Sequence, residues 1–174
     1  RQKNLFGFLF LLMAGFSMAQ GPVAPRKSPV TIAKVNAGTT YIKVVYSQPH
    51  KNERVIFGEL VPFEKVWRLG ANEATELHVT KPITMGGKKI PSGTYSLFAI
   101  PHSNSWTIIV SKQLGLWGSF DYDSEQDLCR FDAKTQKTDV EWEPFTIKID
   151  PDGKNYTLSM MWDMTQVRIP IKAK

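Results

Sequence analysis

The chain has 174 residues, a formal net charge of +6 and one cysteine, Cys129. A single cysteine excludes an internal disulfide, and the length suits one domain that buries one sizeable core. The lysines and arginines are spread along the chain without a cluster that alternates with aromatic residues, so the charge argues against nucleic-acid binding.

Residues 1–19 are expected to be an export signal. Arg1 and Lys3 form its positive end, and an apolar run follows over residues 5–16. Ser17 and Ala19 supply the small side chains that a signal peptidase accepts before residue 20. The apolar run is shorter than the roughly 20 residues that a membrane-spanning helix needs. We therefore expect a secreted or periplasmic protein without a transmembrane segment after cleavage, and its charge without Arg1 and Lys3 is about +4.

The next segment, residues 20–29, contains three prolines and no hydrophobic periodicity, and we expect a flexible tail there. From residue 30 onward, short runs of β-branched and aromatic residues alternate with polar residues, which is typical of strands. Turn-forming residues such as Gly86 and Gly87 separate several of these runs. The expected strands are 30–35, 40–47, 74–80, 83–85, 88–90, 94–100, 106–111, 128–133, 145–149, 156–162 and 166–171.

This pattern predicts a single mostly β domain over residues 30–174. About ten short strands joined by tight turns favour an antiparallel two-sheet sandwich or jelly roll with two long loops. The loops are residues 48–73 and 112–127, and long ordered loops often carry function. We expect a short helix around residues 58–67, which Pro62 limits to a turn or two.

Five stretches of the chain match one known family: Tyr46-Ser47-Gln48-Pro49, residues 56–62, the run Val66-Trp67-Arg68-Leu69-Gly70-Ala71-Asn72-Glu73-Ala74-Thr75, residues 86–98, and Trp117-Gly118. Together they resemble the secreted domain of unknown function 2911 family of Bacteroidetes-type exported proteins. Where the family usually has Tyr-Ser-Arg-Pro, this chain has Gln48 in place of the arginine, so an anion-binding role at that position does not carry over. The resemblance implies an exported β domain.

Three polar residues in the first loop are candidate ligand-binding residues. Arg68, Asn72 and Glu73 combine a cation, an amide and a carboxylate near a glycine-containing bend. Such a set can hydrogen-bond a polyol, a carboxylate or a peptide end. In the alternative interpretation, Arg68 and Glu73 pair with each other or cap backbone groups.

Trp117, in the second loop, is the fourth candidate ligand-binding residue, because its ring can stack on a ligand. The alternative is that Trp117 packs this loop over the sheet. Trp106 and Trp162 lie in alternating runs, so we expect both of them in the core.

No other pattern indicates a specific chemistry. The acidic run 121–127 has the spacing of a calcium loop, but Gln126 stands where an EF-hand needs glycine and Asp132 where it needs glutamate, so a solvated acidic loop is the alternative. The histidines and Cys129 lack metal-ligand spacing, and we expect no metal site and no cofactor. Without a Gly-x-Ser-x-Gly elbow, catalytic residues stay unknown.

Three functions fit these observations. The leading hypothesis is a non-catalytic cell-envelope binding module that takes a glycan or a peptide at Arg68, Asn72, Glu73 and Trp117. The second is an envelope hydrolase in which Glu73 acts as acid or base while Arg68 and Asn72 orient the substrate. The third is a structural component of an envelope assembly. The oligomeric state cannot be read from the sequence.

Overall fold

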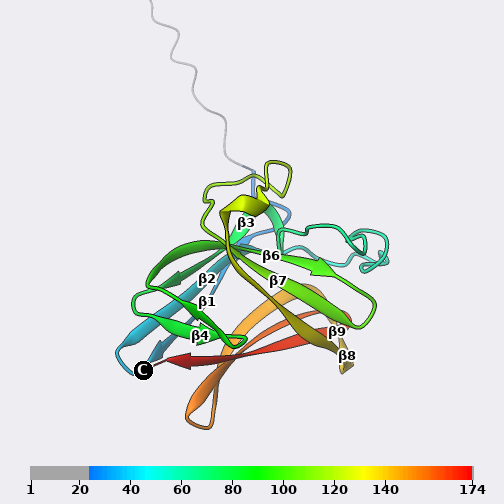
Figure 1. The fold of residues 1–174 in the computed structure, drawn as a ribbon. Coiled ribbons are helices and arrows are strands. Elements are labelled where there is room, and N and C mark those ends of the chain that lie inside the picture. The colour runs from blue at the N-terminus through cyan, green and yellow to red at the C-terminus, as the bar shows by residue number, and fades with distance from the viewer. Residues whose placement is uncertain (1–23, 174) are drawn as a thin grey trace, which may run out of the picture.

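The computed structural model describes residues 24–173, so the expected export signal at residues 1–19 lies outside the described residues, as do the first positions of the expected tail. These described residues form nine strands and one short 3-10 helix (Figure 1). None of the helical structure in residues 24–173 is long and apolar enough to cross a membrane. The elements are β1 (Val30–Ala37), β2 (Thr40–Ser47), β3 (Ala71–Val79), β4 (Ile83–Met85), β5 (Lys88–Ile90), β6 (Gly93–Pro101), β7 (Ser105–Ser111), η1 (Ser124–Gln126), β8 (Asp127–Asp152) and β9 (Asn155–Ala173).

All nine strands belong to one antiparallel sheet in the order β1-β2-β3-β6-β7-β8-β9-β4-β5. The predicted mostly β class is confirmed, whereas the division into two sheets is not. The strands expected separately at 128–133 and 145–149 are parts of β8, which has 26 residues, and those at 156–162 and 166–171 are parts of β9, which has 19. Irregular pairing between β8 and β9 near Trp142 interrupts the alternation that identifies a continuous strand.

The sheet curls so that side chains from distant strands share one core (Figure 1). Val44 on β2, Ile108 on β7 and Met160 on β9 are fully buried in the same cluster. Along β2, buried side chains alternate with partly exposed ones, as expected for a strand with one face toward the core. Burial of this apolar surface stabilises the fold by about 25 cal/mol for each Å² removed from water.

Residues that follow β2 pair with the middle of β8 and help to hold the curled sheet together. His50 forms an isolated bridge with Pro144. The Lys51 amide donates to the carbonyl of Glu143 at 2.8 Å, and the Phe145 amide donates to the carbonyl of Pro49 at 2.9 Å. The start of the first long loop is therefore fixed to the sheet.

An aromatic cluster fills the core beneath this loop. Trp106 and Trp162 are each 1% exposed, which confirms their predicted place in the core. Trp67, from the loop itself, stacks on Trp162 with ring centroids 5.9 Å apart and contacts Phe145 at 5.0 Å. Its backbone also exchanges hydrogen bonds with Ala99 of β6, at 2.7 and 2.9 Å. Trp67 thus anchors the loop in the core.

The helix predicted around residues 58–67 is wrong. This segment consists of turns, with a bridge between Phe57 and Val61. Val61 is buried in the core and its amide donates to the carbonyl of Ile56 at 2.8 Å. Positive φ angles at Gly58 (98°) and Glu64 (61°) turn the backbone between these anchors. Attachment to the core therefore outweighs the local helical preference.

The second long loop covers the opposite face of the sheet. Phe98 and Ile109 are paired neighbours on β6 and β7 and are fully buried, although the residues beside them along each strand face the main core. Leu116 and Tyr122 from the loop pack against them in a second, smaller cluster. The loop is therefore part of the packed structure.

Candidate functional site

The structure brings the four candidate residues together where the first long loop enters β3. Asn72 and Glu73 are early residues of β3, and Glu73 forms an isolated bridge with Trp117. The Gly118 amide donates to the carbonyl of Asn72 at 2.9 Å. A methyl group added at Gly118 would lie 2.5 Å from Nη1 of Arg68, so the guanidinium lies directly against this glycine. Arg68, Asn72, Glu73 and Trp117 thus come from two loops that meet at one place.

The backbone at this place is unusual. Leu69 and Asn72 have φ angles of 52° and 58°, in the left-handed region that non-glycine residues rarely adopt. The carbonyl of Arg68 accepts from the Thr75 amide at 3.1 Å, and the carbonyl of Leu69 accepts from the Thr75 hydroxyl at 2.5 Å. A methyl at Gly70 would lie 2.8 Å from the Ser47 carbonyl, so only glycine fits there. Strained backbone held in this way is frequent at binding sites.

Arg68 is the least satisfied polar side chain of the group. Its Nε atom is buried and has no hydrogen-bond partner among the residues that the structure describes. Burial lowers the pKa of its guanidinium, because the charged form loses water that nothing replaces. Within residues 24–173, no carboxylate offsets this effect of burial on the Arg68 pKa.

Two neighbouring hollows flank Arg68, and it lines both together with Leu60, Val61 and Trp67. One hollow has a volume of 150 Å³ and extends to Phe120; the other has 220 Å³ and extends to Ser28. A guanidinium that borders two hollows can bind a planar anion by donating two parallel hydrogen bonds to it.

Glu73 pairs with Arg26 and not with Arg68, so the Arg68–Glu73 pair of the alternative interpretation is not found. Nη1 of Arg26 lies 2.7 and 2.8 Å from the two carboxylate oxygens of Glu73. This hydrogen bond is the largest cause of a lowered pKa for the Glu73 carboxyl. Glu73 is therefore ionised at neutral pH and does not carry the proton that a general acid needs.

Trp117 is 58% exposed, so it does not pack the second loop over the sheet. Leu116, the preceding residue, has that role. Phe120, two positions beyond Gly118, is 82% exposed. Phe120 lines the 150 Å³ hollow together with Arg68, and Trp117 bridges to Glu73. Both rings offer exposed apolar surface suited to stacking on a flat or apolar ligand group.

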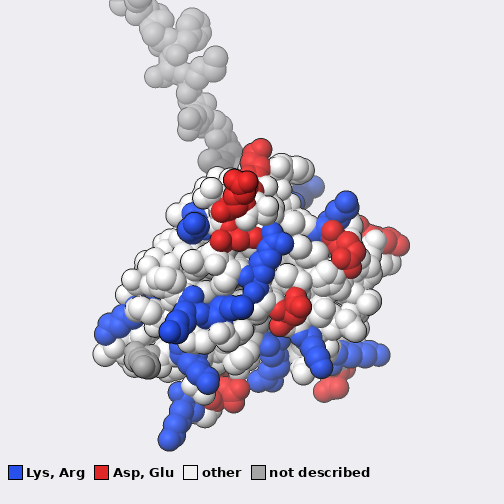
Figure 2. Space-filling view, viewed as in Figure 1, with Lys and Arg blue, Asp and Glu red and all other residues white. Residues whose placement is uncertain are grey.

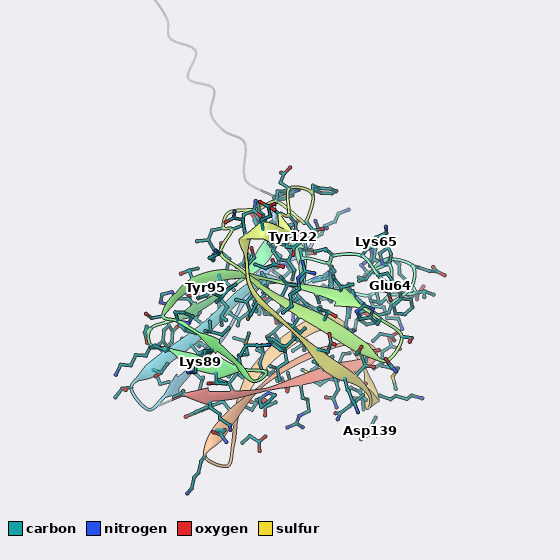
Figure 3. The ribbon with its side chains drawn as sticks, in the orientation of Figure 1. Glu64, Lys65, Lys89, Tyr95, Tyr122 and Asp139 are labelled. Carbon is teal, nitrogen blue, oxygen red and sulfur yellow. The ribbon has the colours of Figure 1, made fainter. Side chains whose placement is uncertain are left out.

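The acidic run 121–127 has protein partners for two of its carboxylates. The Asp123 carboxylate caps η1 by accepting from the Glu125 amide at 2.9 Å. Asp127 accepts from the Tyr122 hydroxyl at 2.9 and 2.8 Å and from Nε of Arg130 at 2.6 Å. Burial, helped by Asp127, raises the pKa of Tyr122 to about 12. Figure 3 labels Tyr122 at this end of the molecule.

No metal site emerges in the described part of the chain, since residues 24–173 contain no group of three or more His, Cys, Asp or Glu that could hold an ion. Figure 2 shows acidic side chains gathered at the end of the visible face that carries the second loop, while lysine and arginine side chains are spread below them.

A histidine network that sequence patterns did not reveal lies on the other side of the first loop. His102 contacts Glu64 through Nδ1 at 2.7 Å and Thr107 through Nε2 at 3.0 Å, beside a hollow of 330 Å³. The order Glu64, His102 and Thr107 resembles the acid, base and nucleophile of a catalytic triad. The Thr107 hydroxyl, however, donates its single proton to Asp132 at 2.6 Å, so His102 is not placed to remove it. The network instead ties the loop to β7 and β8.

The tail residues Arg26 and Ser28 also belong to the site, and the sequence did not identify them. Nδ2 of Asn72 donates to the Ser28 carbonyl at 3.4 Å. No local pattern marks these residues, because their partners are more than forty positions away in the chain.

In a comparison with known families, a family model described as "Protein of unknown function (DUF2911)" matches residues 28–171. The matched region contains both long loops and all four candidate residues, and it begins after Arg26. Comparison with curated proteins and with solved structures gave no match.

Proposed function

The chain belongs to the DUF2911 family of proteins of unknown function, and from that premise we propose that it is an exported, non-catalytic binding module of the cell envelope. Its ligand, a glycan or a peptide, presents a carboxylate to Arg68. The observation that carries this proposal is the Arg68 guanidinium, whose Nε is buried without a partner among residues 24–173, between two hollows.

An unpaired, partly buried cation is costly to keep. Arginine has five N–H donors, and each buried donor without an acceptor costs about 1–3 kcal/mol. An apolar side chain would fill the same space beside Leu60 and Val61 without that cost. A ligand carboxylate that bonds to the guanidinium would remove the penalty, so the cost is recovered on binding.

The surroundings of Arg68 favour an elongated ligand. The two hollows continue on either side of the guanidinium, toward Phe120 and toward Ser28. Trp117 and Phe120 expose ring surface that suits a sugar ring or a peptide side chain. The chain of the ligand would therefore lie in one or both hollows, with its carboxylate at Arg68.

The hydrolase alternative is less well supported. As a general acid Glu73 would need a proton near neutral pH, whereas Arg26 lowers the pKa of its carboxyl. As a general base its carboxylate would have to be free to accept a proton, whereas both of its oxygens already accept from Arg26. The export part of the proposal is based on the composition of residues 1–19.

The proposal is tested by titrating purified protein with matched pairs of ligands that differ in one carboxylate. The pairs are oligogalacturonate with its neutral methyl ester, and a short peptide with a free or an amidated C-terminus. We expect calorimetric binding of at least one acidic member, weakened about tenfold or more for its neutral counterpart. Arg68→Gln should weaken it by a similar factor, since a charge-assisted hydrogen bond contributes about 1.5–3 kcal/mol.

Arg168→Gln is the matched control, because Arg168 is an exposed arginine on β9. The proposal is wrong if acidic and neutral ligands bind equally, if Arg68→Gln binds as the wild type does, or if neither acidic ligand binds. A stable protein partner in a pull-down, together with no small-ligand binding, would favour the assembly role.

A further inference from the structure

Residues 26–29 lie across the candidate site as a short strap just before β1. Figure 1 shows the described N-terminal end reaching the sheet close to β3. The strap has no regular secondary structure, and its side chains are mostly exposed. Its position is therefore set by a few specific contacts with the residues around it.

Each contact joins the strap to a residue at or next to the site. Nη1 of Arg26 donates to the two carboxylate oxygens of Glu73 at 2.7 and 2.8 Å. The Ser28 carbonyl accepts from Asn72 at 3.4 Å, and the Pro29 carbonyl accepts from the Gln48 amide at 2.9 Å. Ser28 also lines the 220 Å³ hollow that contains Arg68. The Pro29 contact continues the pairing of β1 with β2, so the site itself recognises two groups of the strap: the Arg26 guanidinium and the Ser28 main-chain carbonyl.

We propose that the strap occupies the place of the ligand, and that the ligand is a peptide whose basic side chain replaces Arg26 on Glu73. This inference rests on the proposed function and narrows its ligand to a peptide. Main-chain carbonyls and a guanidinium are features of a peptide, and a glycan has neither. The peptide would present its carboxylate to Arg68 and its cation to Glu73.

The strap can leave at little cost. The side chains of Arg26 and Glu73 are 50% and 45% exposed, and ion pairs as exposed as this one are weak. A tethered segment nevertheless competes at a high effective concentration, so a peptide that lacks the cation would not gain from displacing it. The strap therefore makes the site selective for ligands with both charges.

The test uses two tetrapeptides with free C-termini, Ala-Arg-Ala-Ala and Ala-Gln-Ala-Ala, titrated into the whole protein by NMR or calorimetry. We expect the arginine peptide to bind more tightly. Arg26→Gln should strengthen its binding about two- to fivefold, because the competing ion pair is lost. Glu73→Gln should remove the preference for arginine over glutamine.

Lys27→Gln is the matched control, since it removes the same charge from the neighbouring residue of the strap. The inference is overturned if both peptides bind equally to the wild type and to Arg26→Gln, which would make Arg26 a simple anchor. It is also overturned if Arg26→Gln abolishes a concentration-dependent self-association, because the occupant would then be a second copy of the chain.

The two proposals fail differently. If acidic ligands bind through Arg68 but the arginine peptide has no advantage, the proposed function stands and the strap inference falls. If the arginine peptide is preferred through Glu73 whatever its C-terminus, the strap inference stands and the carboxylate role of Arg68 falls.

Discussion

Two arginines, one in each loop region, have opposite surroundings. Arg130, just after the second loop, donates to Asp127 at 2.6 Å and to the Tyr122 hydroxyl at 2.7 Å. Arg68, in the first loop, has a buried Nε that no other described residue satisfies. The paired arginine fastens a loop to the sheet, whereas the Nε of Arg68 has no partner among the described residues, as the proposed ligand-binding role requires.

The backbones of the two loops differ in the same way. Non-glycine residues with positive φ occur throughout the first loop, at Asn52, Glu53, Glu64, Leu69 and Asn72. In the second loop, as described, only glycines have positive φ. Each left-handed non-glycine residue costs about 1 kcal/mol or more. The first loop thus keeps a conformation that stability alone does not favour.

The largest effect on the free energy of unfolding is expected from removing the packing beneath the second loop. Phe98 is fully buried, and its ring lies 5.0 Å from that of Tyr122. Phe98→Ala should lower the free energy of unfolding by about 3–5 kcal/mol, measured by urea denaturation. Phe120→Ala, at an exposed ring in the same loop, should change it by about 0.5 kcal/mol or less. Equal effects of the two substitutions would show that the loop is not packed.

A smaller effect is expected from breaking the paired cluster of the second loop. Asp127→Asn should cost about 1–2 kcal/mol at pH 7 and lower the pKa of Tyr122 from about 12 toward its ordinary value. Because the folded-state pKa is raised, this stabilisation is complete below pH 10 and is lost as the pH rises through about 12.

The titration of Tyr122 can be followed from the ultraviolet difference between the wild type and Tyr122→Phe. Asp121→Asn, a nearby exposed acid, is the control and should leave both the stability and the titration unchanged. An unchanged Tyr122 titration in Asp127→Asn would contradict the pairing.

The smallest effect on the free energy of unfolding is expected at Arg68, where a substitution should stabilise the protein. Arg68→Met removes an unpaired buried donor while keeping a long apolar stem, so the protein should gain up to about 1 kcal/mol in the free energy of unfolding. Thermal and urea unfolding with and without an acidic ligand would measure this. A clear loss of stability would mean that Arg68 is structural, and the contrast with Arg130 would disappear.

The β class was predictable because alternation is a local property of each strand. The long strands β8 and β9 were not, since irregular pairing near Trp142 breaks that alternation. The helix predicted at residues 58–67 does not form because the core holds Val61 and Trp67. Local helical preference contains no information about such long-range contacts.

The candidate site likewise has a part that the sequence predicted and a part that it could not predict. A glycine-containing bend marked Arg68, Asn72 and Glu73, and these residues do lie beside Trp117. The part played by Arg26 could not be foreseen, because its contact with Glu73 joins residues 47 positions apart. Their role in ligand binding stays a prediction.

Strand β8 has a further consequence, which concerns how the protein folds. Its first residues pair with β7 and its later residues pair with β9, so the same strand completes both parts of the sheet. Neither part can close its hydrogen-bond ladder until β8 is extended, and the pairing of β2 with β3 must also enclose the long first loop. Closing such loops costs entropy before contacts repay it, which slows folding. We therefore expect the protein to fold slowly and as one cooperative unit, with the pairing of β8 as the step on which the rest of the sheet depends.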